Sequence, residues 1–301
     1  MLGNERGSHP AAERIALGTT SLSLLLFVAL VAVFTVYASR LALAQAADSF
    51  SDVFTAIALL VSMRIAAQPP DETHPLGHQR AEPIAALVAA VIAGVLAVEV
   101  FRDAVQALLT GAEPEMGFPL LVVFGVKLSI KAAIVFAARA RQRLQPSPAL
   151  NALRVDAQND VAVGAVAVVG FFAARYGWLG LDAWLALPVA LWIGWSGFDL
   201  ARENIRLLMG EAPPSARRHE LTSIAGSVPG VISVHNLRAR FHGAELDVLL
   251  DVVVDADLSL RKAHDIGHAV ELRLIDEEDV CHVLVHVDLE GPDAELVAAE
   301  P

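Results

Sequence analysis

The sequence contains very little cysteine and no excess of basic residues. Its single cysteine, Cys281, has no partner for an internal disulfide, which suits a reducing compartment. Lysine and arginine number 22 against 34 acidic residues, so the net charge is −12. Phosphate binding requires a basic surface, and this balance therefore argues against a nucleic-acid partner. The sequence also lacks His-Glu-x-x-His or a comparable nucleophile and base, which argues against an intramembrane protease.

Hydrophobic residues are abundant and unevenly distributed. They make up 55% of the 301 residues, above the roughly 45–50% of soluble proteins, and the excess lies between residues 13 and 209. A helix needs about 20 apolar residues to cross a bilayer, and the first apolar run is too long for a signal peptide and lacks a cleavage site. The pattern predicts six membrane spans, at 14–39, 41–66, 80–108, 117–142, 150–174 and 181–208.

The basic residues at the span ends predict the orientation. Cytoplasmic loops carry an excess of lysine and arginine. Only Arg40, Arg175 and Arg102 fall on one side of the predicted spans. The larger group on the other side consists of Arg6, Arg14, Arg80, Arg139, Arg141, Arg143, Arg202 and Arg206. We therefore expect a multi-pass protein of the cell (inner) membrane with both termini in the cytoplasm.

The C-terminal part of the chain, from about residue 212, has the composition of a soluble domain. Alternating apolar residues within 231–240, 246–255 and 280–289 predict three strands. Helices are expected at 215–226 and 259–275, which gives the order helix, strand, strand, helix, strand. The predicted fold class is an α-helical membrane protein with six transmembrane helices (1–211) and a cytoplasmic α+β domain (212–301) whose helices cover one face of the sheet.

Four aspartates lie inside predicted membrane spans. Asp48 and Asp52 are in the second span, and Asp156 and Asp160 are in the fifth. In each pair the i,i+4 spacing places both carboxylates on one helix face. A charge at the bilayer centre costs about 3 kcal/mol or more, which a bound cation or proton would offset. Four carboxylates would form an oxygen-rich site suited to Mg²⁺, Mn²⁺ or Fe²⁺; the alternative is that they cap helix ends or reach water.

Two further sets of residues have the chemistry of metal ligands. Asp71, His74 and His78 lie within eight residues of each other in a connector rich in turn-forming residues. They form either a small metal site or an ordinary polar loop. The C-terminal domain is rich in histidine, and His286 and Asp288 share one face of the last predicted strand. These residues either bind metal or form the solvated face of a sheet. The histidines of this domain are His219, His235, His242, His264, His268, His282 and His286.

Two lysines interrupt the fourth predicted span. Lys127 and Lys131 are one helical turn apart, so they share a face. We expect them to line the interior of the helix bundle or to pair with acids such as Glu99 or Asp103.

Several motifs in this order resemble the cation diffusion facilitator family. They are SRLALAQAADSFSD at 39–52, HPLGHQRAE at 74–82, DAQND at 156–160, and the helix-strand-strand-helix-strand tail. The resemblance covers nearly the whole chain. It implies a homodimeric six-helix secondary transporter, not an enzyme, with a cytoplasmic metallochaperone-like domain. Such proteins export divalent metals in exchange for protons, with no cofactor beyond transported or regulatory ions such as Mn²⁺, Fe²⁺ and Zn²⁺.

The resemblance also implies roles for particular residues. The transport site falls on Asp48, Asp52, Asp156 and Asp160. The loop site of the zinc-transporting members falls on Asp71, His74 and His78. A site at the dimer interface of the tail falls on His235, Asp251, His264, His286 and Asp288.

Two departures from the family pattern bear on function. Zinc-selective members carry a histidine in the transport site, whereas positions 48 and 156 are both aspartate here, as in manganese-type members. Zinc transporters also pair a basic residue at the position of Arg80 with an aspartate after the sixth span. Met209 occupies that acidic position, so the pairing is either absent here or uses Glu211. The rival hypothesis is a membrane-bound metal sensor that binds metal without transporting it.

Overall fold

The chain divides into two compact units, Met1–Ile205 and Arg206–Pro301, where the sequence predicted a boundary at 211/212. The computed structural model describes residues 10–37, 40–111, 118–144, 147–178 and 180–289, although some side chains within these ranges, including that of Asp48, lie outside the description. The unit boundary precedes the end of the sixth helix because Arg206 pairs with Glu211 and the Glu211 carbonyl accepts a hydrogen bond from the Phe241 N–H.

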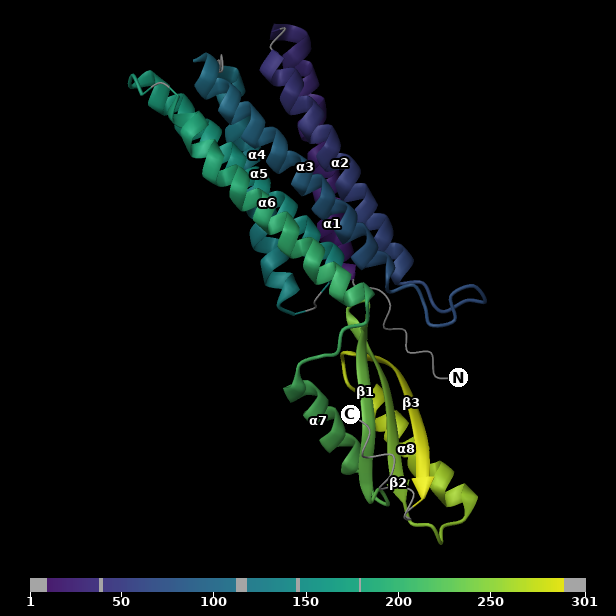
Figure 1. Ribbon diagram of the computed structural model, residues 1–301. Helices are drawn as coiled ribbons and strands as arrows, with labels where there is room; N and C mark the ends of the chain where they lie inside the picture. The colour runs from purple at the N-terminus through teal and green to yellow at the C-terminus, as the bar shows by residue number, and fades with distance from the viewer. Residues whose placement is uncertain (1–9, 38–39, 112–117, 145–146, 179, 290–301) are drawn as a thin grey trace. The chain divides into compact units, whose positions relative to one another are not determined.

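The first unit is a bundle of long helices that run alongside one another (Figure 1). Each of the six predicted spans corresponds to a helix, and the helices follow in the predicted order. Within the described residues, α1, α3, α4, α5 and α6 are long and apolar enough to cross a membrane, while the span predicted for α2 stays a prediction. Their bounds are α1 Pro10–Tyr37, α2 Arg40–Ala66, α3 Ala81–Thr110, α4 Phe118–Gln142, α5 Pro148–Arg175 and α6 Leu181–Leu208.

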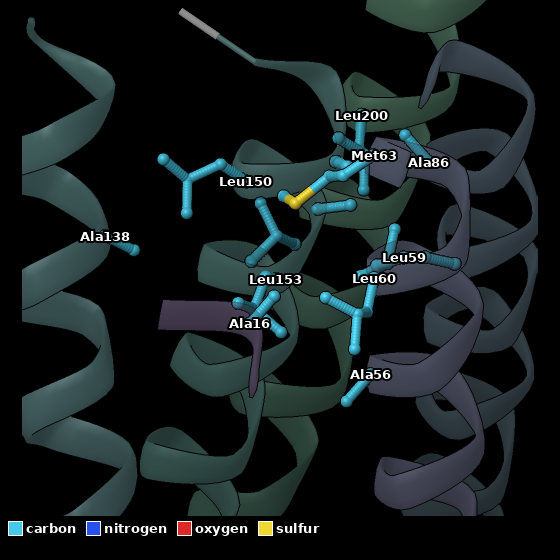
Figure 2. Packing of buried hydrophobic residues seen from close by; sticks show 14 of the residues in the cluster. Ala16, Ala56, Leu59, Leu60, Met63, Ala86, Ala138, Leu150, Leu153 and Leu200 are labelled. Carbon is cyan, nitrogen blue, oxygen red and sulfur yellow. The ribbon is translucent and has the colours of Figure 1, made fainter. Parts of the chain in front are cut away.

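The bundle core is made of small and branched aliphatic side chains contributed by all six helices. Figure 2 shows Leu60 and Met63 of α2 gathered with Leu150 and Leu153 of α5. Ala56 belongs to the same cluster and lies one helical turn after Asp52. The apolar packing between α2 and α5 therefore ends about one helical turn from the predicted transport site.

Small residues allow neighbouring helices to approach closely. A Cβ atom added at Gly197 of α6 would lie 3.2 Å from both the Ala90 carbonyl oxygen and the Ala93 Cβ of α3. Close approach at glycine and alanine is the usual basis of helix packing in membranes, where apolar burial gives little driving force.

A buried hydrogen-bond network fixes the start of α5. The Ser147 hydroxyl accepts a hydrogen bond from the Leu150 N–H and donates one to Glu82 at the beginning of α3. The same carboxylate accepts a hydrogen bond from the Ala149 N–H. These contacts cap N–H groups that have no partner within the helix and tie the start of α5, the helix that carries Asp156 and Asp160, to α3.

The second unit is a three-stranded sheet covered on one face by two helices, as predicted. Its elements are α7 Ser215–Gly226, β1 Ser233–His242, β2 Glu245–Val254, α8 Leu260–Ile275 and β3 Val280–Leu289. In the strand order β1-β2-β3, β1 and β2 are antiparallel whereas β2 and β3 are parallel. Alternate residues of β2 face the core with Leu221 of α7 and Val270 of α8. The other face of the sheet therefore carries the polar residues.

Candidate metal-binding sites

The structure brings three of the four intramembrane aspartates together. Asp52 of α2 and Asp156 and Asp160 of α5 each offer a carboxylate oxygen, and these oxygens lie within 4.8 Å of one another. We call these three residues the aspartate cluster. The side chains of Asp52 and Asp160 are almost fully buried, while that of Asp156 is 24% exposed. Asp48 lies in α2 one turn before Asp52, but its side chain lies outside the described residues.

Both lysines of α4 face the aspartate cluster. Lys131 Nζ lies 3.1 Å from Asp52 Oδ2 and 3.5 Å from Asp156 Oδ2, and it also contacts Asp160. Lys127 Nζ lies 3.6 Å from Asp52 Oδ2. The prediction that the lysines line the bundle interior is confirmed, because both are buried.

The suggested pairing of Lys131 with Glu99 or Asp103 is wrong. Both acids are exposed on α3, and Asp103 pairs there with Arg102. Spacing along the sequence placed both lysines on one face of α4. The direction of that face depends on how α4 packs, and the structure turns it toward α2 and α5.

The aspartate cluster has the chemistry of a hard-cation site. Carboxylate oxygens from two helices converge in a largely buried part of the bundle, and they are the ligand type that Mg²⁺, Mn²⁺ and Ca²⁺ prefer. No thiol or imidazole belongs to the cluster among the described residues. Such an arrangement can exchange one set of cations for another without covalent chemistry.

The three loop residues also come together. Ligand atoms of Asp71, His74 and His78 lie within 4.8 Å of one another, and the two imidazole centroids are 4.5 Å apart. A hydrogen bond from the Thr73 hydroxyl and another from the His74 N–H lower the pKa of Asp71 to about 2. The carboxylate is therefore ionised at neutral pH and available to a cation, as in the site that the sequence predicts.

In the C-terminal unit, three of the predicted ligands form a row across the sheet. His235 of β1 is the register partner of Asp251 in β2, and Asp251 is the register partner of His286 in β3. Asp288 lies two residues further along the same face, with an oxygen 3.1 Å from His286 Nε2. A β-bulge after His235 brings the Asn236 amide to within 2.8 Å of Asp251 Oδ2. The open sheet face therefore collects four of the five predicted tail ligands.

The fifth predicted tail ligand is on a different face. His264 belongs to α8, which packs on the opposite side of the sheet, where Gly267 meets Val287. In the part of the tail that the structure describes, no three potential ligands lie within 4.8 Å of one another. One copy of the chain thus does not assemble the predicted tail site.

A second row of charged and polar side chains lies on the same sheet face and was not predicted from the sequence. Asp247 lies between its register partners Arg240 and His282 and is hydrogen-bonded to both, at 2.9 Å in each case. Burial opposes ionisation of Asp247, but these hydrogen bonds outweigh it and hold the pKa of Asp247 below its usual value. The signal was present in β2, because Asp247 and Asp251 are four residues apart and share a face.

The acid proposed to follow the sixth span has a local partner. Glu211 forms a two-point ion pair with Arg206, and Met209 is exposed. Within the second unit, Glu211 is therefore engaged by the last turn of α6.

Two family models match the chain. The model of the cation efflux transmembrane domain matches residues 17–209. The model of the cation efflux protein cytoplasmic domain matches residues 213–290. The first model alone spans more than half of the sequence and includes all residues of the aspartate cluster.

Similar proteins were found among curated sequences and solved structures. An uncharacterized transporter of Methanocaldococcus jannaschii is 32% identical over 259 residues, which are 84% of this chain and 90% of that protein. The cation-efflux pump FieF of Citrobacter koseri is 29% identical over 279 residues, 92% of each chain. The C-terminal domain of MamM, in a variant form, is 26% identical and covers 25% of this chain and 96% of that domain, with a TM-score of 0.25.

Proposed function

The chain belongs to the cation efflux family and is a multi-pass membrane transporter of divalent metal rather than an enzyme, and from that premise we propose that it exports Mn²⁺, Fe²⁺ or Zn²⁺ from the cytoplasm in exchange for protons. The observation that carries this proposal is the aspartate cluster, in which buried carboxylates from α2 and α5 converge. Ionisable groups within membrane helices mark ion and proton pathways.

The proposed cycle needs only cation binding and protonation. The ionised carboxylates of Asp52, Asp156 and Asp160 bind the metal ion when the site faces the cytoplasm. A rearrangement of the helices then exposes the site to the other side, where protons replace the metal. Asp48 is the fourth ligand in this proposal, because it lies one turn from Asp52 on the same helix.

The remaining parts of the chain serve the same function in this proposal. Asp71, His74 and His78 form a metal site in the connector between α2 and α3, and the tail binds metal at a homodimer interface. Both termini lie in the cytoplasm and the protein resides in the cell (inner) membrane. No cofactor is needed beyond transported or regulatory metal ions.

Metal flux into proteoliposomes tests the proposal. Asp52→Ala and Asp160→Ala should each reduce Mn²⁺ and Zn²⁺ flux to the level of empty liposomes, while both variants remain folded and dimeric by size-exclusion chromatography. Asp103→Ala is the matched control, since it removes an exposed acid of the same unit, and it should transport like the wild type. Wild-type flux in the two cluster variants would contradict the proposed transport site.

The same assay separates transport from sensing. A membrane-bound sensor would bind metal with the same residues but would give no flux in liposomes. A pH-sensitive dye inside the liposomes should report proton movement opposite to the metal. Metal flux without proton movement would leave efflux intact and remove the antiport.

A further inference from the structure

Lys131 is a fully buried cation at the centre of the aspartate cluster. Only 1% of the residue is exposed, and it is the largest side chain with so little exposure in the described part of the chain. Lysine is almost never fully buried unless its charge is paired. Here the ammonium group meets a carboxylate of every member of the aspartate cluster, so its position is determined by the same groups that would bind the metal.

A metal ion and the Lys131 ammonium cannot occupy the cluster together. Small divalent ions such as Mg²⁺ and Zn²⁺ bind carboxylate oxygens at about 2.0–2.2 Å. Lys131 Nζ is within 3.5 Å of Asp52 Oδ2 and Asp156 Oδ2 and in contact with Asp160. An ion coordinated by these oxygens would overlap with Nζ or would place two like charges in direct contact inside the bilayer. The ammonium must therefore leave before the ion can bind.

We propose that Lys131 is a tethered competitor of the transported metal ion, whose ammonium holds the carboxylates of the aspartate cluster until a divalent cation displaces it. This inference rests on the proposed function of the cluster as the transport site. It assigns to α4 a direct part in setting metal affinity, although α4 supplies none of the ligands.

The tether has two consequences for transport. First, every metal ion must overcome the ion pairs of Lys131, so the affinity of the site is lower than three buried carboxylates would otherwise give, and release is faster. Second, when the metal leaves, the returning ammonium neutralises a carboxylate charge that would otherwise require a proton. A lysine has a long flexible stem and three donors, so it can swing between positions without a movement of α4.

Lys127 provides an internal comparison. It lies one turn from Lys131 on the same helix and is also buried, and its ion pair with Asp52, at 3.6 Å, is longer than any Lys131 contact with the aspartate cluster. Removal of Lys127 takes the same charge from the same region. It should affect metal binding much less, because the Lys127 ammonium lies further from the carboxylates than that of Lys131.

The decisive variants are Lys131→Met and Lys127→Met in the full-length protein. Calorimetry with Mn²⁺ should show that Lys131→Met binds about tenfold more tightly than the wild type or better, while Lys127→Met changes the dissociation constant by no more than about threefold. Lys131→Arg retains the charge and should bind closer to the wild type. Heat that disappears in Asp160→Asn identifies binding at the cluster. Unchanged or weaker binding by folded Lys131→Met overturns the proposal.

A measurement on the wild type decides the question if Lys131→Met does not fold. The chain contains three lysines, and Lys262 is exposed on α8. Lys262 therefore serves as an internal reference when the lysines are methylated with formaldehyde and a borohydride reductant and the products are measured by mass spectrometry. Saturating Mn²⁺ should increase the modification of Lys131 several-fold relative to Lys262, because the displaced ammonium moves into the path of the ion. Equal or reduced modification with Mn²⁺ bound overturns the proposal.

Failure of this inference is distinguishable from failure of the proposed function. If the wild type transports Mn²⁺ and Asp160→Ala does not, the transport site stands whatever the lysine variants show. If Lys131 shows neither tighter binding on removal nor greater reactivity with Mn²⁺, it is a structural ion pair only. If Asp160→Ala transports normally, the proposed function itself fails.

Discussion

Asp156 differs from its neighbours in the aspartate cluster because its side chain is 24% exposed, against 7% for Asp52 and 6% for Asp160. It also forms the longest of the Lys131 contacts, at 3.5 Å. A more accessible ligand can be replaced with less disturbance of the bundle. Asp156 is therefore the position at which the chemistry of the cluster is most readily altered.

Asp156→His should shift selectivity toward Zn²⁺, because imidazole suits zinc whereas carboxylates suit harder ions. We expect the wild type to carry Mn²⁺ or Fe²⁺ at least as well as Zn²⁺, and the variant to raise the ratio of Zn²⁺ to Mn²⁺ flux by about threefold or more. Flux under competition is the quantity to measure, since Zn²⁺ binds most sites more tightly than Mn²⁺. An unchanged ratio would mean that selectivity comes from helix packing instead.

Asp247 should contribute its full stabilisation of the folded tail domain only above its unfolded pKa. Its folded pKa is lowered, so the stabilisation is fully present above the unfolded value of about 3.9 and is lost as pH falls through the folded pKa. Asp247→Asn in the tail domain should cost about 1–3 kcal/mol at neutral pH and less in acid. Thermal unfolding between pH 3 and 7 measures this, with the exposed Asp265→Asn as the control.

At the scale of helices and strands, a glycine of α8 allows this helix to pack closely against β3. A Cβ atom added at Gly267 of α8 would lie 2.7 Å from Val287 Cγ2 in β3. Valine is stiff about χ1, so this side chain cannot move aside at low cost. The contact sets how closely α8 lies on the sheet.

Gly267→Ala should destabilise the tail domain by about 1–3 kcal/mol, the usual cost of overpacking, despite the better helix propensity of alanine. Gly226→Ala is the matched control. Its added Cβ would meet Val234 at an ordinary 3.8 Å, so its stability should change little. Urea unfolding of both variants measures the difference, and equal midpoints would show that α8 can shift away from β3.

Much of the element order was predictable from the sequence, because it depends on local signals. The six helices follow apolar runs, and Ser259 caps α8 by accepting a hydrogen bond from the Lys262 N–H. The i,i+4 spacing likewise placed Asp156 and Asp160 on one face of α5. The sequence could not predict how each helix is rotated about its own axis or which residues pair between neighbouring strands. The contact of Lys131 with the cluster depends on how α4 turns, and the rows of the tail sheet depend on strand register, which a bulge shifts between His235 and Arg238.

At the scale of the whole molecule, the predicted tail site raises the question of how many chains build it. One chain places His235, Asp251, His286 and Asp288 on the open face of the sheet, while His264 belongs to the helix on the other face. A site that contains all five residues therefore needs a second copy to supply His264. The homodimer implied by the family resemblance would bring that second copy.

Residues 212–296 expressed alone should be soluble and dimeric and should bind divalent metal through these five residues. Imidazole must be neutral to bind metal, so the affinity should weaken as pH falls below about 6.5. Calorimetry at neutral pH measures the binding, and its absence would remove the tail site. His264→Ala and His286→Ala should each weaken binding, by about tenfold or more.

Mixing these two variants tests whether the site combines residues of two chains. In a dimer of one His264→Ala chain and one His286→Ala chain, a shared site leaves one complete set of ligands and one set that lacks both histidines. The mixed dimer should therefore bind metal at half the wild-type stoichiometry with wild-type affinity, whereas neither variant alone does so. If each site were built within one chain, both sites of the mixed dimer would be damaged and no tight binding would return. Since metal bound between chains must also tighten the dimer, by linkage, the dissociation constant of the wild-type dimer should fall with added metal, and that of either variant should not.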